Sequence, residues 1–157
     1  MRAWKTYGAA VALLLFLASG KLPGTDVARL EPVEAVQICR EEGRTVIRTD
    51  TGQWGKGKSL KEALEDMKQT ASKEVFLETA VWLMIDPASV EDLTELETMI
   101  RPNCRLCLYT GRDELSEAAA FLNQQKLTFL LRQWREGKIP SLYKREGRLY
   151  LDKGESG

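Results

Sequence analysis

Two short segments near the start of the folded body alternate apolar and polar residues, which is the pattern of half-buried β-strands. In residues 33–40 the odd-numbered positions share one face and the even-numbered positions the other, and residues 45–50 alternate in the same way. Residues 41–44 lie between them as a turn. We therefore expect an antiparallel hairpin, followed by a glycine-rich loop over residues 51–58.

Apolar residues recur at helical spacing in four later segments. Ser59 is expected to cap the first helix together with Glu62, because this spacing lets each side chain accept a bond from the other residue's amide. Ser89 and Asp92 have the same spacing and are expected to cap a second helix after Pro87. The expected buried positions are Leu60, Ala63, Leu64 and Met67; Leu93, Leu96, Met99 and Ile100; Leu115, Ala118, Ala119 and Leu122; and the apolar residues of an amphipathic segment at 127–135.

Further strands are predicted between and after these helices. Residues 75–85 are apolar except for Glu78 and Thr79, which predicts a central strand covered on both faces. Residues 104–110 predict another strand. Residues 142–145 and 148–152 predict a C-terminal hairpin.

This order of elements indicates the fold class. An initial hairpin followed by alternating strands and helices predicts an α+β fold with a mixed sheet, an N-terminal hairpin, three to four helices packed on the sheet, and a C-terminal hairpin. A chain of 157 residues is the size of a single domain. We place that domain at residues 33–152, after a linker at 21–32 and before a disordered tail at 153–157.

The first 20 residues have the pattern of a secretory signal. Arg2 and Lys5 precede an uncharged run at 7–20, which is shorter than the ~20 residues that a membrane-spanning helix needs. Ala18 and Gly20 are small residues at the spacing of a cleavage site, so we expect cleavage after Gly20. The chain is thus expected to be exported, and then secreted or associated with the membrane. A lipid anchor is not expected, because position 21 is Lys where a lipobox has Cys.

Composition narrows the classes of function. Lysine plus arginine and aspartate plus glutamate each total 23 and form no long block, which argues against nucleic acid as a partner. The chain has no histidine, which excludes hydrolases that use a histidine base and removes a common metal ligand. We therefore expect no catalytic residue, no metal site and no cofactor.

One motif would instead indicate that the chain binds a nucleotide. The segment from Gly52 through Gly57 and Lys58 to Ser59 satisfies the Walker A pattern between a strand and a helix, where backbone amides would hold phosphate and lysine would neutralise it. However, an exported domain meets little ATP, and residues 45–50 alternate, whereas a phosphate loop follows a continuously apolar parallel strand. A small nucleotide-binding protein is therefore the alternative function.

Cysteine and tryptophan supply the other candidates. Cys104 and Cys107 have redox-motif spacing, but within a strand residues three apart point to opposite faces, so we expect buried structural thiols there. Trp54 lies among glycines and lysines, where it could be a contact for a partner or fold back onto the sheet. Trp82 and Trp134 lie on apolar faces and are expected in the core.

The order of landmarks resembles the N-terminal domain of the Ger(x)C spore-germination proteins. The matching segments are Asp50-Thr51-Gly52 with Gly57-Lys58-Ser59-Leu60, the helix at Glu62-Ala63-Leu64, the apolar segment 75–85, the helix 93–100 leading to Arg101-Pro102, the strand 105–109, and Ile139-Pro140-Ser141 before the last hairpin. The chain covers the first part of that family's length. The resemblance implies a non-enzymatic, extracytoplasmic protein that acts by contact with germination-receptor subunits in the membrane.

Overall fold

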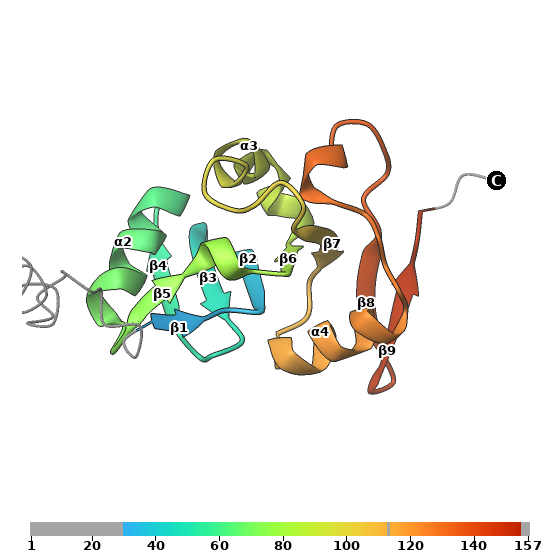
Figure 1. Cartoon of the computed structure of the whole chain (residues 1–157), viewed down its shortest axis with the longest axis horizontal. Coiled ribbons are helices and arrows are strands. Elements are labelled where there is room, and N and C mark those ends of the chain that lie inside the picture. Colours follow the sequence, from blue (N-terminus) through green and yellow to red (C-terminus); the bar gives the residue numbers. More distant parts are fainter. Residues whose placement is uncertain (1–29, 113, 155–157) are drawn as a thin grey trace, which may run out of the picture.

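A seven-stranded mixed sheet organises the part of the chain that the computed structural model describes, residues 30–112 and 114–154. Its strands lie in the order β4-β3-β2-β6-β7-β8-β9, from one edge of the molecule to the other (Figure 1). A separate pair, β1 with β5, is parallel. The strands are β1 (Leu30–Pro32), β2 (Ala35–Glu41), β3 (Arg44–Thr49), β4 (Trp54–Gly57), β5 (Glu74–Phe76), β6 (Trp82–Ile85), β7 (Arg105–Tyr109), β8 (Ser141–Arg145) and β9 (Arg148–Asp152).

The centre of the sheet is parallel and both edges are antiparallel. Strands β2, β6, β7 and β8 run the same way, while β3 and β4 extend the β2 edge and β9 extends the β8 edge by antiparallel pairing. Parallel neighbours need crossover connections, and here short helices supply them. The helical segments are α2 (Leu60–Thr70), η2 (Leu77–Thr79), η3 (Pro87–Asp92), α3 (Leu93–Leu96), α4 (Leu115–Gln124) and η4 (Leu131–Gln133), where η denotes a 3₁₀ turn.

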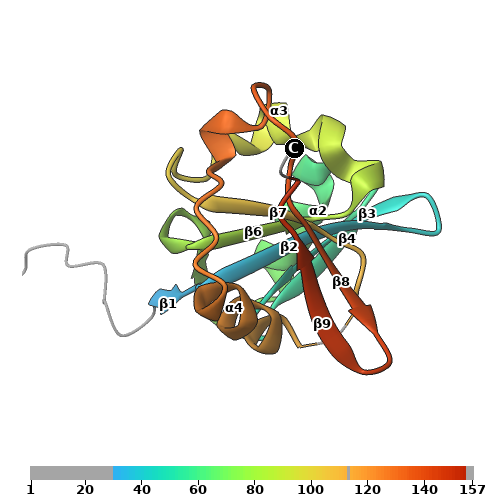
Figure 2. The ribbon, with the colours of Figure 1, turned by 90° about the vertical axis from the view of Figure 1, so that its right-hand side faces the viewer.

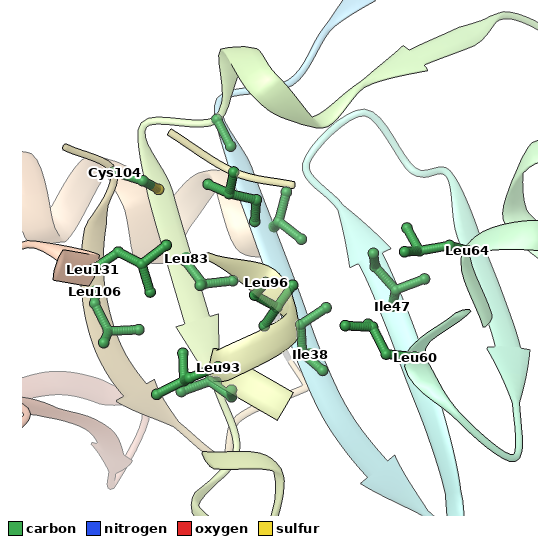
Figure 3. Packing of buried hydrophobic residues seen from close by; sticks show 14 of the residues in the cluster. Ile38, Ile47, Leu60, Leu64, Leu83, Leu93, Leu96, Cys104, Leu106 and Leu131 are labelled. Atoms are coloured by element: carbon green, nitrogen blue, oxygen red, sulfur yellow. The ribbon is translucent and has the colours of Figure 1, made fainter. Parts of the chain in front are cut away.

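Helices cover both faces of the sheet and so create two apolar layers. Figure 2 shows α3 and α4 on opposite sides of the strands. The larger layer lies under α2 and α3 and includes Ile38 and Leu83 (Figure 3). Neither of these residues nor Ile85 of the same layer has exposed surface. On the other side, α4 packs over Trp82, Met84 and Tyr109. A sheet buried on both faces explains why the central strands carry apolar side chains on both faces.

Both predicted hairpins are confirmed. In the first, β2 pairs with β3 around Glu42 and Gly43, whose φ angles are 52° and 75°. In the last, β8 pairs with β9 around Glu146 and Gly147, with φ angles of 51° and 76°. Two left-handed residues in a two-residue loop give the turn whose twist matches the strands.

The expected fold class is also confirmed, as α+β with one mixed sheet, three α-helices in the described residues, and a hairpin at each end of the described chain. Among the domain limits, Leu30–Pro32 was predicted as linker but forms β1. The predicted signal at 1–20, the rest of the linker at 21–29 and the last three tail residues lie outside the described residues.

The prediction of one strand over residues 75–85 is wrong. Only Trp82–Ile85 belongs to the main sheet, and it follows β5 and the turn η2. The interruption coincides with the contacts of Thr79, whose hydroxyl accepts from the amide of Val33 at 2.9 Å and donates to the carbonyl of Phe76 at 2.7 Å, with the carbonyl of Val33 also within reach at 3.1 Å. Thr79 thus bends the segment and fixes it to the start of the first hairpin.

The second predicted helix is shorter, and its cap is a different residue. Asp86 caps the turn η3 by accepting from the amide of Ala88 at 2.8 Å, whereas Ser89 is fully buried, and α3 spans only four residues. A carboxylate directly before Pro87 reaches the first free amide sooner than Ser89 could. The buried positions Leu93, Leu96 and Ile100 were predicted correctly.

The predicted helix at residues 127–135 is also wrong, apart from the single turn η4. Backbone bonds hold this segment against β7 instead: the amide of Leu106 donates to the carbonyl of Phe129 at 2.9 Å, and that of Leu131 to Cys104 at 2.7 Å. Pairing with a neighbouring strand therefore overrides the helical pattern. Trp134, expected in the core, is half-buried beside it.

Candidate interaction surface

The glycine-rich segment predicted as a loop contains the edge strand β4. Trp54–Gly57 pairs antiparallel with β3, placing Trp54 opposite Arg48 and Gly57 opposite Thr45. The initial hairpin is therefore a three-stranded meander. A phosphate loop needs consecutive amides that turn around an anion, but here alternate amides of the segment face β3.

Two glycines of the Walker-like segment have a packing role. A Cβ on Gly55 would lie 2.1 Å from the carbonyl oxygen of Ala63, and a Cβ on Gly57 would lie 2.5 Å from the amide nitrogen of Ala63. Both contacts are with the backbone of α2. The glycines therefore let helix and strand approach more closely than any side chain would permit.

The amides of this segment that point away from β3 donate hydrogen bonds to acidic side chains of α2. The amide of Lys56 donates to Asp66 Oδ2 at 2.9 Å, and that of Lys58 donates to Glu62 Oε2 at 2.8 Å. Ser59 Oγ accepts from the amide of Glu62 at 3.3 Å, so Ser59 caps α2 as predicted, although the carboxylate of Glu62 returns to Lys58 rather than to Ser59. These amides are therefore not free to bind a phosphate, because carboxylates already accept hydrogen bonds from them.

All three thiols are free and buried in the structure. Cys104 faces the layer under α3 and Cys107 the layer under α4, which places them on opposite faces as predicted. Burial raises the pKa of each of these two thiols to about 12. At Cys39 burial also raises the pKa, and the nearby charge of Arg48 opposes that shift. None of these environments favours a reactive thiolate.

A polar cluster lies where β2 ends and η3 begins. Arg40 Nη2 donates a hydrogen bond to Glu91 Oε1 at 2.7 Å and lies 3.6 Å from Asp92 Oδ1. Four buried atoms near these groups have no hydrogen-bond partner: Arg40 Nε, Thr45 Oγ1, Ser89 Oγ and Asp92 Oδ2. Burial raises the pKa of Asp92, which the charge of Arg40 partly offsets. The cluster holds η3 against the hairpin at the cost of burying charge.

Trp54, a residue singled out from the sequence, is the most exposed large apolar side chain of the described chain. Its exposed fraction is 58%, and it lies on the edge strand β4. It shares a face with Arg48, because the two are directly opposite in the β3–β4 ladder. That face points away from α2, since Gly55 and Gly57 between the outward residues contact the helix. The indole therefore lies on the face of β4 opposite to α2.

Ion pairs surround Trp54 on this face. Arg48 pairs with Glu41, and Lys56 Nζ lies 3.3 Å from Glu42 Oε2. The sheet residues packed with α4 come from β2, β6, β7, β8 and β9, and none comes from β3 or β4. We call this region, defined by Trp54, Arg48, Lys56, Glu41 and Glu42, the Trp54 surface. The Trp54 surface therefore combines one exposed aromatic side chain with charged side chains of both signs.

A second exposed aromatic feature was not singled out from the sequence. Tyr143 of β8 and Tyr150 of β9 are directly opposite, and their rings stack with centroids 5.7 Å apart. Both side chains are exposed, by 45% and 41%. This tyrosine pair could have been predicted from the sequence, because the two-residue turn at Glu146 and Gly147 fixes the register that places the two tyrosines opposite each other.

A wide groove of about 950 Å³ lies beside the end of α2. Its apolar floor includes Leu64, Val75 and Met99, and its rim carries lysines and glutamates, among them Lys68 and Glu78. Since the rim has both signs of charge, it does not select one class of charged ligand.

The described residues hold no group of three or more His, Cys, Asp or Glu side chains that could bind a metal ion. No helix within residues 30–112 and 114–154 has the length and apolar character needed to cross a bilayer. Comparison of the chain with protein-family models, with curated proteins and with solved structures finds no match.

Proposed function

We propose that this chain is a non-enzymatic, exported protein that acts by protein–protein contact at the outer face of a membrane. The observation that carries the proposal is the Trp54 surface, where an indole on a sheet edge is 58% exposed. Tryptophan is enriched among the residues that contribute most of the binding energy at protein interfaces. The resemblance to the N-terminal domain of the Ger(x)C spore-germination proteins suggests germination-receptor subunits in the membrane as partners.

Nucleotide binding, the alternative function, is not favoured by any contact in the Walker-like segment. Asp66 and Glu62 accept bonds from the amides of Lys56 and Lys58, and they would repel a phosphate placed there. The glycine spacing is accounted for by contact with α2. We therefore do not propose that this chain binds a nucleotide.

The experiment that tests the proposed function joins localisation with site-specific crosslinking. In a spore-forming host, protease added to intact protoplasts should degrade the chain, because it lies outside the membrane. A photoreactive residue at position 56, within the Trp54 surface, should crosslink a membrane-receptor subunit, while the same residue at exposed Lys61 of α2 should not. Trp54→Ala should weaken that association about 30-fold or more, as expected of an interface anchor. A protected, cytosolic chain would contradict the proposal, as would equal crosslinking at both positions.

A further inference from the structure

Strand β9 forms the free edge of the sheet opposite to β4, and its sequence is complementary to itself. The five residues read Arg148-Leu149-Tyr150-Leu151-Asp152. If a second copy pairs antiparallel about Tyr150, Arg148 of each chain lies opposite Asp152 of the other, and Leu149 lies opposite Leu151. We propose that two copies of this chain associate through β9, forming one continuous sheet with a two-fold axis at Tyr150.

The backbone of β9 suits this pairing. In a hairpin with a two-residue turn, the residues that flank the turn exchange both hydrogen bonds, and every second residue along the strand does the same. Arg148, Tyr150 and Asp152 therefore direct their backbone groups to β8. The amides and carbonyls of Leu149 and Leu151 point outward, to the side where the sheet has no further strand. In the proposed register these outward groups meet those of Leu151 and Leu149 of the second copy.

The side chains select the same register. Arg148, Tyr150 and Asp152 share one face of β9, and residues directly opposite in an antiparallel pair share a face. Shifting the register until two Arg148 residues or two Asp152 residues are opposite would place like charges together. Parallel pairing in register would do the same. The antiparallel register about Tyr150 forms two Arg–Asp pairs at once.

Both faces of the strand gain contacts from this arrangement. On one face, the stacked Tyr143 and Tyr150 would continue into the second copy as a row of four aromatic rings. On the other face, Leu149 and Leu151 are only half-buried against the layer under α4, and they would pack against their counterparts. The pairing would thus bury apolar surface that one chain leaves partly exposed.

The charges of β9 are available for such pairing. Arg148 has no ion-pair partner among residues 30–112 and 114–154. Asp152 lies 4.0 Å from Lys138 Nζ, and 57% of its side chain is exposed. A loose, exposed ion pair of this kind contributes little and does not prevent a second partner. The inference does not rest on the Trp54 surface, which lies at the other edge of the sheet.

A charge-reversal experiment tests the pairing directly. In sedimentation equilibrium of the full chain, the wild type should form a concentration-dependent dimer. Arg148→Asp places Asp opposite Asp152, and Asp152→Arg places Arg opposite Arg148, so each should weaken self-association at least about tenfold. Mixing the two variants should restore a dimer, because each position again meets its opposite charge. Lys61→Asp and Glu65→Arg, exposed changes of equal charge on α2, should leave the dimer unchanged.

A disulfide experiment tests the axis even if the charge variants fold poorly. Two Tyr150→Cys residues at the two-fold axis would lie within bonding range on mild oxidation, whereas Tyr143→Cys, one strand further inside each copy, would not. A covalent dimer of Tyr150→Cys alone supports the pairing. A wild type that stays monomeric at high concentration overturns the proposed pairing. Failure of the mixed charge variants to associate, or equal crosslinking of Tyr150→Cys and Tyr143→Cys, would do the same. The β9 edge would then be free for a different occupant.

Discussion

The backbone of β4 touches the backbone of α2 where Gly55 lies beneath Ala63, with only 2.1 Å between the carbonyl oxygen of Ala63 and the place that a Cβ on Gly55 would occupy. Gly55→Ala should therefore separate strand and helix and lower the free energy of unfolding by about 3 kcal/mol or more. Gly52→Ala is the matched control. Gly52 has open space around it and only a φ of 86° to accommodate, which costs about 1 to 2 kcal/mol. Equal urea midpoints for the two variants would contradict this packing role.

Leu83 should be among the most sensitive positions of the core. It has no exposed surface and belongs to the same buried cluster as Ile38 and Leu93 (Figure 3). Leu83→Ala is expected to cost about 2 to 5 kcal/mol in unfolding free energy, because it removes buried methyl groups and leaves a cavity. Val81→Ala, two residues away at a position that is 41% exposed, should change stability by about 0.5 kcal/mol or less. Urea unfolding of both variants measures the difference.

Asp92 should lower stability at neutral pH. Burial raises the pKa of this carboxyl in the folded chain, so the folded state binds the proton more tightly than the unfolded state does. The ionised form therefore costs stability once the pH exceeds the usual value of 3.8, and the cost disappears below it. Asp92→Asn should raise the urea midpoint at pH 7 and leave it nearly unchanged at pH 3. The control, Glu91→Gln, alters a carboxylate that is 73% exposed. A gain that is the same at both pH values would exclude this explanation.

The thiols should be inert in the folded chain. Burial raises the pKa values of Cys104 and Cys107 to about 12, so at pH 8 almost no thiolate is present at either residue. A thiol reagent added to the native protein should label these two cysteines slowly, at a rate set by unfolding. In denaturant all three thiols should react at once. Rapid native labelling of Cys107 would show that α4 does not seal its layer.

The parts of the fold that the sequence predicts well are those with local causes. The stripe at Leu60, Ala63, Leu64 and Met67 requires only helical spacing, and Ser59 begins the helix through its own side chain. The two hairpins follow from two-residue turns. These features depend on residues only a few positions apart, and local physics therefore suffices to predict them.

The features that sequence analysis misses depend on distant contacts. Strand β4 contains two glycines, a composition typical of loops, and it becomes a strand because α2 folds over it. The segment before β6 is bent by a bond between Thr79 and Val33, which are 46 positions apart. Residues 127–135 have helical spacing but pair with β7. In each case a tertiary contact overrides the local pattern.

The candidate surfaces also combine features that the sequence predicts locally with features that depend on distant contacts. Trp54 could be named from the sequence as a potential contact, because its neighbours are glycines and lysines that offer it little apolar cover. The charged rim formed by Arg48 with Glu41 and Lys56 with Glu42 needs the strand pairing to bring these residues together. The tyrosine pair of the last hairpin could have been found from the turn alone.

The two edge strands, β4 and β9, lie at opposite ends of the seven-stranded sheet. In a dimer joined at β9 the two Trp54 side chains would be separated by thirteen strand spacings, up to about 60 Å at about 4.8 Å each. Such an arrangement is bivalent: one dimer could engage two receptor complexes in the same membrane. The second contact would then form at a high effective concentration, so that weak contacts at each Trp54 would add up to durable attachment.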